Sequence, residues 1–153
     1  MVSIYDVLLN TSRVPYLVKE KEVEYAKIMS TSAPEFVDQF FRDVFHMDML
    51  PEEHLFILAL ASDNSILGVF EISRGTVNKS IVSPRELLQR LLLIGAVGFI
   101  LCHNHPSQNV QPSQDDISVT GRIKSAAELL DIKLLDHVII GNGFYSFAEQ
   151  NLI

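Results

Sequence analysis

The apolar positions of this chain follow helical spacing in three segments and strand-like spacing between them. Each helical segment opens on a serine with an acidic residue three positions later, a pattern typical of a helix N-terminus. The predicted helices start at Ser32, Ser83 and Ser113, and the second ends near Gly95. The first has an aromatic face, for which we expect core packing, although a partner-binding surface would have the same spacing. This face consists of Phe36, Val37, Phe40, Phe41, Val44 and Phe45.

Runs of β-favouring residues predict strands on both sides of the second helix. The first two runs are separated by Ser62-Asp63-Asn64, a cluster of turn formers, and are expected to form a hairpin. The continuous apolar run at 97–102 predicts a strand covered on both faces. This order of elements predicts an α/β fold, a mixed β-sheet flanked by helices. The predicted strands are residues 54–61, 65–73, 97–102, 132–140 and, after a turn at 141–143, residues 144–147.

The N-terminal residues have a different pattern. No glycine precedes Gly68, and residues 19–24 form a mixed-charge stretch with few apolar anchors. We therefore expect residues 1–31 to form a partly helical N-terminal arm that packs on a main domain of residues 32–153.

Composition narrows the class of protein. The chain has 153 residues, is 48% hydrophobic and carries a formal net charge of -7, as expected for one compact domain that repels phosphate. The longest apolar run, residues 91–102, is too short to cross a hydrocarbon core of ~30 Å. Residues 1–9 lack the basic residues of a secretory signal, and the single cysteine, Cys102, cannot form an internal disulfide. These features predict a cytoplasmic protein without a membrane span.

The residues that suggest chemistry follow the strand at 97–102. His103 and His105 are two apart on an extended segment, so both imidazoles project to one face and can share a metal ion. Asp116 falls in the first turn of the third predicted helix and is expected to face back toward the strand end. Two imidazoles and one carboxylate leave a fourth tetrahedral position open, which is typical of catalytic zinc. The pattern therefore favours hydrolysis.

Such a site needs a nearby carboxylate as a base. Glu71 is the candidate because it lies within an otherwise apolar strand, where a carboxylate is costly without a partner, although an exposed edge position would also explain it. Asp115 is expected to be either an outer partner of the site or a solvated residue. Among the other histidines, we expect His137 to be a buried core residue and His46 and His54 to be surface or boundary residues. Cys102 is expected to point away from the metal and to fill the core.

These residues resemble the JAMM metalloprotease signature, His103-x-His105, seven residues, Ser113, two residues, Asp116, with Glu71 upstream. More narrowly, residues 53–149 resemble the bacterial RadC family. The motifs that carry this resemblance are Glu71-Ile72-Ser73-Arg74-Gly75-Thr76, Ser83-Pro84-Arg85-Glu86, His103-Asn104-His105-Pro106-Ser107, Leu135-Asp136-His137 and Tyr145-Ser146-Phe147-Ala148-Glu149.

The resemblance implies a JAB/MPN fold, related in architecture to cytidine deaminases. It implies one Zn²⁺ per chain held by His103, His105 and Asp116. Glu71 would take a proton from the attacking water and deliver it to the leaving amine, and Ser113 would donate its hydroxyl to the developing oxyanion. Many relatives have glycine where this chain has Gln108, a difference expected to reshape the loop over the metal. The helix-hairpin-helix module of longer relatives is expected to be absent.

Three functions are consistent with these observations. The leading hypothesis is a zinc-dependent hydrolase that acts on a peptide or isopeptide substrate. The alternatives are a non-catalytic, metal-stabilised interaction module and a nucleic-acid processing role suggested by the DNA-repair label of the family. The acidic pI of about 5.1 counts against direct nucleic-acid binding. A contiguous His-Asn-His argues against an HNH nuclease, and the lack of cysteine ligands argues against a deaminase. A homodimer through the helix at Phe36–Phe45 stays open.

Overall fold

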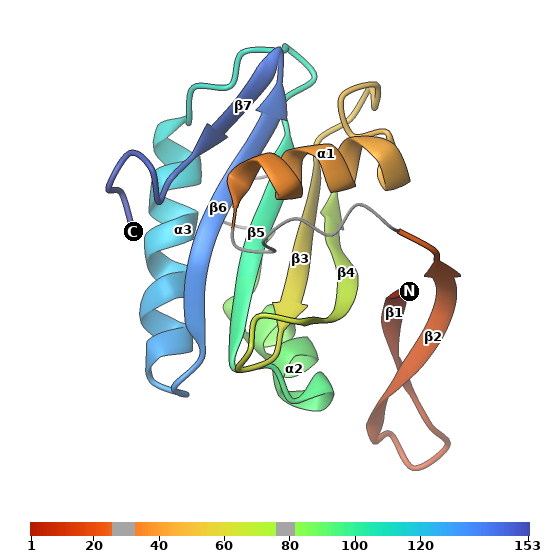
Figure 1. Ribbon diagram of the computed structural model, residues 1–153. Coiled ribbons are helices and arrows are strands. Elements are labelled where there is room, and N and C mark those ends of the chain that lie inside the picture. The colour runs from red at the N-terminus through yellow and green to blue at the C-terminus, as the bar shows by residue number, and fades with distance from the viewer. Residues whose placement is uncertain (26–32, 76–81) are drawn as a thin grey trace.

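The computed structural model describes residues 1–25, 33–75 and 82–153. Within these ranges the chain forms one seven-stranded mixed sheet in the order β2-β1-β4-β3-β5-β6-β7, with helices on both faces (Figure 1). The helices are α1 (Pro34–Phe45), α2 (Pro84–Ile94) and α3 (Gln114–Glu128). The strands are β1 (Val2–Leu9), β2 (Pro15–Val23), β3 (His54–Leu60), β4 (Ile66–Arg74), β5 (Gly98–Asn104), β6 (Lys133–Gly141) and β7 (Gly143–Ser146). The predicted α/β class is confirmed.

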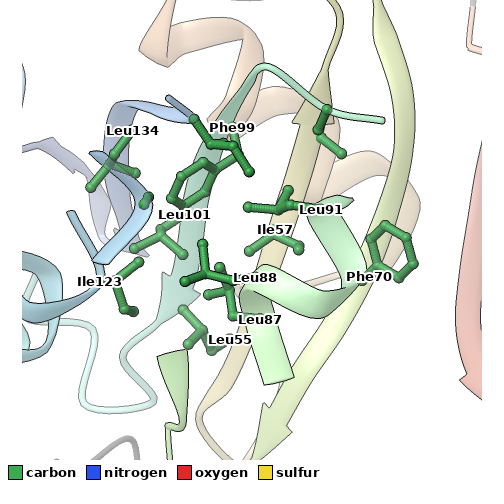
Figure 2. Packing of buried hydrophobic residues seen from close by; sticks show 14 of the residues in the cluster. Leu55, Ile57, Phe70, Leu87, Leu88, Leu91, Phe99, Leu101, Ile123 and Leu134 are labelled. Carbon is green, nitrogen blue, oxygen red and sulfur yellow. The ribbon is translucent and has the colours of Figure 1, made fainter. Parts of the chain in front are cut away.

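The sheet separates two hydrophobic clusters. Helix α1 covers one face, here called the α1 face, where Phe40 and Phe41 pack with Phe56 and Cys102. Helices α2 and α3 cover the other, the α2/α3 face, and Figure 2 shows leucines of α2 packed against β3 and β5. Cys102 thus fills the core as predicted, and the aromatic face of α1 is core packing rather than an exposed surface.

The central strands fix the positions of the candidate site residues. Every residue of β3 and β5 is buried, which confirms the prediction of a strand covered on both faces. β3 and β4 form the predicted antiparallel hairpin, and β3 also pairs antiparallel with β5, with Leu55 opposite His103. This register brings the start of β3, the end of β4 and the end of β5 to one end of the sheet.

The N-terminal arm differs from the prediction. Residues 1–25 contain no helix; instead β1 and β2 pair antiparallel, and β1 joins the sheet in parallel with β4. The four consecutive charged residues of β2, at positions 19–22, are exposed. The Ser3 hydroxyl donates to Glu22 across the pair, and Lys19 donates to Glu22 along the strand. Residues 26–31 of the predicted arm lie outside the described residues.

The predicted helix starts show three outcomes. Ser113 and Asp116 form a reciprocal capping box at α3. Ser83 is the N-cap of α2 but makes no side-chain capping bond, and α2 ends at Gly95 with φ +73°. Ser32 lies outside the described residues. In the parts of the chain that the structure describes, no helix has the length and apolar character needed to span a membrane.

Candidate metal centre

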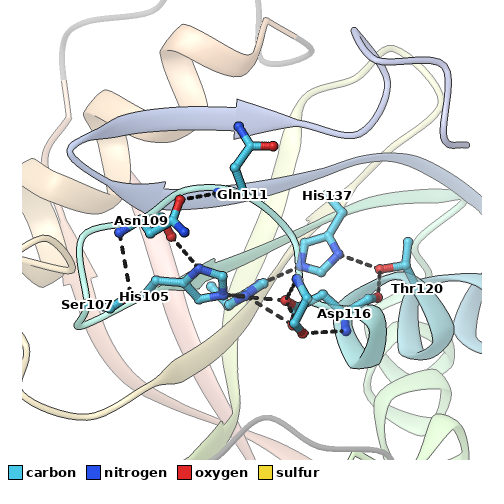
Figure 3. A network of polar contacts seen from close by, with 9 residues as sticks. His105, Ser107, Asn109, Gln111, Asp116, Thr120 and His137 are labelled. Carbon is cyan, nitrogen blue, oxygen red and sulfur yellow. Dashed lines mark hydrogen bonds and ion pairs between the residues drawn. The ribbon is translucent and has the colours of Figure 1, made fainter.

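The three predicted ligands converge at the junction of β5 and α3. The Nε2 atoms of His103 and His105 lie 2.9 Å apart, and each lies 3.4 Å from an oxygen of the Asp116 carboxylate (Figure 3). His103 and Asp116 are buried and His105 is partly exposed, so the cluster opens to solvent on the side of His105. One ligand atom from each of the three residues lies within 4.8 Å of the other two, a grouping that could hold a metal ion.

A chain of hydrogen bonds behind His103 fixes its tautomer. The Thr120 hydroxyl donates to the carbonyl of Asp116 at 2.6 Å, so its oxygen accepts from Nδ1 of His137, also at 2.6 Å. The Nε2 of neutral His137 must then accept from Nδ1 of His103, 2.7 Å away. This order of protons leaves the Nε2 lone pair of His103 facing the cluster. His137 is buried as predicted, but it also orients a candidate ligand.

His105 is oriented in the same way by its own loop. Its Nδ1 lies 2.6 Å from the carbonyl oxygen of Asn109, which can only accept, so Nδ1 carries the proton. The Nε2 lone pair of His105 therefore also faces Asp116. Two imidazole acceptors and a carboxylate meet without a donor between them, and such a set requires a proton or a cation at its centre. The donor set could hold a divalent metal ion.

Ser113 supports the third ligand. Its backbone N–H and its hydroxyl both donate to Oδ2 of Asp116, at 2.7 and 2.6 Å, and the Asp116 N–H donates to the hydroxyl oxygen at 3.1 Å. The hydroxyl that was predicted to meet an oxyanion is bonded to the Asp116 carboxylate in this structure. Asp115 is exposed, so of the two acids in this turn only Asp116 faces the cluster.

Burial and hydrogen bonds set the ionisation of the cluster. Burial lowers the pKa of His103 to about 4, despite the opposing effect of the Asp116 carboxylate, and lowers the pKa of His137 well below its ordinary value. Hydrogen bonding to Asp116, which only the protonated imidazole can donate, raises the pKa of His105. Burial opposes ionisation of Asp116, but the attraction of the carboxylate to protonated forms of His105 and His103 and the bonds from Ser113 outweigh it and lower the Asp116 pKa. The metal-free cluster therefore holds a carboxylate beside a neutral His103.

The structure places Glu71 away from this cluster. Glu71 pairs laterally with Phe56, which in turn pairs with Cys102, so the Glu71 side chain lies on the α1 face. There it accepts from Nδ1 of His54 at 2.7 Å and from Nε of Arg74 at 3.5 Å. His103 pairs with Leu55 of the α2/α3 cluster and lies on the opposite face. Glu71 therefore does not stand beside the metal ligands as predicted, and His54 is a buried partner of Glu71 rather than a surface residue.

Glu53, which no sequence motif singled out, lies just before β3, beside the end of the sheet where the candidate ligands meet. It precedes Leu55 by two residues and so projects to the α2/α3 face, next to the end of β5. The charge of its carboxylate contributes to raising the pKa of His105, after hydrogen bonding to Asp116. Its backbone carbonyl accepts from the N–H of Gly75 at 2.8 Å.

Asn104 holds the backbone on both sides of Glu53. Its Nδ2 donates to the carbonyl of Glu52 at 2.9 Å, and its Oδ1 accepts from the N–H of His54 at 2.7 Å. Asn104 stands between the two histidine ligands and is buried on the α1 face. One residue of β5 thus ties the position of Glu53 to that of the candidate metal ligands.

Gln108 shapes the loop after His105. Its φ of +66° is a left-handed conformation that glycine adopts more readily than other residues. Its side-chain amide donates to the carbonyl of Asp48 at 3.2 Å, and its own carbonyl accepts from the N–H of Asn142 at 2.9 Å. A Cβ added to Gly141 would lie 2.8 Å from the Gln108 carbonyl oxygen. The loop is therefore packed tightly on the turn after β6.

The fold and the His-His-Asp cluster together define a JAB-type domain with a candidate metal centre. The chain belongs to the RadC-like JAB domain family, which it matches over residues 31–152. Similar proteins include the UPF0758 proteins of Clostridium kluyveri, 43% identical over 105 residues (68% of this chain, 46% of the relative), and Clostridium botulinum, 42% identical over 108 residues (70% and 47%). The UPF0758 protein of Clostridium perfringens is 36% identical over 138 residues (90% and 60%). The chain spans about half the length of these curated relatives.

Proposed function

We propose that this domain is a zinc-dependent hydrolase that cleaves an amide or isopeptide bond. The observation that carries the proposal is the convergence of two oriented imidazole lone pairs and a carboxylate, with no donor of their own, at 2.9 and 3.4 Å. When bound, a divalent cation supplies Lewis acidity, which polarises a carbonyl and makes water more acidic. Zinc suits this donor set because it favours imidazole nitrogen and carboxylate oxygen.

In this proposal Glu53, rather than Glu71, is the general acid and base. Its carboxylate takes a proton from the attacking water and returns it to the leaving nitrogen, a role that requires it to face the ligand cluster. Its position on the ligand face, its influence on His105 and the Asn104 bonds on either side of it support this role. Ser113 is the proposed oxyanion donor, for which its hydroxyl hydrogen must turn from Asp116 to the substrate.

The test compares two acids that differ in the face they occupy. Zinc-loaded protein is screened against libraries of fluorogenic peptides and of lysine isopeptides, and Glu53→Gln and Glu71→Gln are assayed on every substrate found. We expect Glu53→Gln to lower kcat by about 10²- to 10⁴-fold with its metal retained, as for loss of a general base. Glu71→Gln should stay within a few-fold of the wild type.

Two outcomes contradict the proposal. Equal activity of Glu53→Gln and the wild type removes Glu53 from the mechanism. Metal-loaded wild type that cleaves no member of either library favours the alternative of a non-catalytic JAB module in which the metal only stabilises the loop.

A further inference from the structure

A cavity of about 460 Å³ lies between the edges of β1 and β4, away from the metal ligands. Four consecutive residues of β4, Glu71–Arg74, and three of β1, Ile4–Asp6, line it. Successive side chains of a strand point to opposite faces, so a cavity that touches consecutive residues of both strands lies along their edges. In the described chain β1 and β4 pair at one position, Ile4 with Val69, whereas β1 pairs with β2 along its length. We call this opening the β1–β4 slot.

The main chain of β4 points polar groups into the slot. The N–H of Gly75 donates to the carbonyl of Glu53 on the β3 side. In an antiparallel pair the residues that bond the neighbouring strand alternate with residues that face away from it. Arg74, paired with His54, therefore directs its N–H and C=O to the opposite edge, which borders the slot.

Side chains add specific partners to this edge. Among the described residues, Ser73 Oγ and Arg90 Nε are buried without a hydrogen-bond partner, and both residues line the slot. Buried polar atoms are normally bonded, so these two indicate a missing polar partner. Asp6 pairs with Arg90 at 3.6 Å and Glu71 with Arg74, and Glu20 adds a further carboxylate. The surplus of acid favours an occupant with a lysine or arginine side chain.

We propose that the β1–β4 slot binds an extended peptide segment, which pairs with the β4 edge as an added strand. A peptide main chain supplies donors and acceptors at the spacing of a strand edge, and strand addition is an established mode of peptide recognition. β3 alone separates β4 from β5, because Phe56 pairs with both Glu71 and Cys102. β4 thus lies about 10 Å, two strand spacings, from the strand that carries His103, and a segment bound in the slot lies one spacing further away. That the bound segment belongs to the substrate rests on the proposed function, whereas binding itself does not need the metal.

The test separates main-chain pairing from charge attraction with two variants of one residue. A display library of random dodecapeptides is selected on the wild-type chain, and selected peptides are measured by fluorescence polarisation. Arg74→Pro removes the edge N–H at a position where an edge strand tolerates proline, and Arg74→Ala keeps it. We expect Arg74→Pro to raise Kd at least ten-fold, Arg74→Ala to stay within about three-fold and His105→Ala to bind as the wild type, with basic residues enriched in the peptides.

Several results would contradict the proposal that the β1–β4 slot binds a peptide. These are a selection that yields no peptide, equal binding by Arg74→Pro and wild type, or loss of binding in His105→Ala. If Arg74→Pro does not fold, hydrogen exchange of the wild type decides: the Arg74 amide must exchange more slowly with peptide bound. Peptides that bind the slot but are never cleaved by zinc-loaded protein would contradict the proposed function and leave the slot intact.

Discussion

The two faces of the sheet at the start of β3 contain similar residues and differ in how these are paired. On the α2/α3 face, His103, His105 and Asp116 direct acceptor atoms at one another. On the α1 face, the Glu71 carboxylate accepts from both the His54 imidazole and the Arg74 guanidinium. The first set lacks a positive centre and the second already contains one. A cluster of histidine and acid is therefore a metal site only when its own hydrogen bonds leave the lone pairs unused.

The largest expected difference between the faces is in metal binding. We expect about one zinc per chain in the wild type and in His54→Ala. In His105→Ala we expect the zinc affinity to fall at least about 100-fold. Loss of a residue that only orients a ligand typically lowers metal affinity about 10- to 100-fold, and loss of a ligand itself should lower it more. Plasma mass spectrometry of protein purified without chelator or metal-affinity resin, followed by competition with a zinc indicator, measures both. Equal loading of the two variants would contradict the assignment.

The next effect is the pH dependence of stability without metal. Burial lowers the pKa of His103 in the folded chain to about 4, whereas the same side chain in the unfolded chain has a pKa of about 6.5. As the pH falls below about 6.5, His103 is therefore protonated in the unfolded chain before it is protonated in the folded one. The free energy of unfolding should therefore fall across this window, by about 3 kcal/mol from His103, and the raised pKa of His105 offsets part of the loss. Urea unfolding with EDTA at pH 7.5, 6, 5 and 4 measures it.

Zinc provides the control for this pH dependence. Metal binds only deprotonated imidazole, so added zinc should steepen the dependence of stability on pH in the wild type. His105→Ala should respond little to the metal. A flat profile in EDTA would mean that His103 is not held neutral by burial.

The smallest expected effect is on the paired face. Glu71→Gln should lower the free energy of unfolding by less than about 1 kcal/mol, because the side chain of Glu71 is 37% exposed and the amide oxygen still accepts from His54. Thermal unfolding at neutral pH, beside wild type, is sufficient to measure it. A loss of 3 kcal/mol or more would show that the α1-face cluster is a structural centre rather than a surface pair.

The sequence predicted the ligands because they belong to one local unit. His103, His105 and Asp116 lie on a strand, a loop and a helix start within 14 consecutive residues, so strand alternation and helix capping determine their directions. The Ser113 capping box formed as the local pattern indicated. The hydrophobic periods of the helices and central strands were predictable for the same reason.

The position of Glu71 was not predictable, because the face that it occupies depends on a bulge. Ser73 pairs with Leu55, so an unbroken ladder would pair Glu71 with Ile57 and place it on the α2/α3 face. The register shifts between Leu55 and Phe56, and Glu71 pairs with Phe56 instead. One extra residue in β4 moves the carboxylate to the other face of the sheet. No local feature of the sequence marks that shift.

The N-terminal strands were missed for a related reason. The charged stretch at residues 19–24 has too few apolar residues to show the spacing of a helix or the alternation of a strand, so its secondary structure could not be assigned from the sequence. Its structure depends on pairing with β1, which is a non-local contact. Similar alternating charges occur on exposed helices, so the local pattern did not separate the two.

The close approach of Gly141 to Gln108 limits which sequences this domain can adopt. Any side chain at position 141 would begin with a carbon 2.8 Å from the Gln108 carbonyl, and the same loop presents the carbonyl that holds His105. A mutation there would have to move the loop, and the loop cannot move without turning a ligand. Substitutions in the turn at Gly141 and in the loop at Gln108 can therefore be accepted only in combination. In a saturation-mutagenesis experiment, position 141 should tolerate as few residues as the candidate ligand positions do.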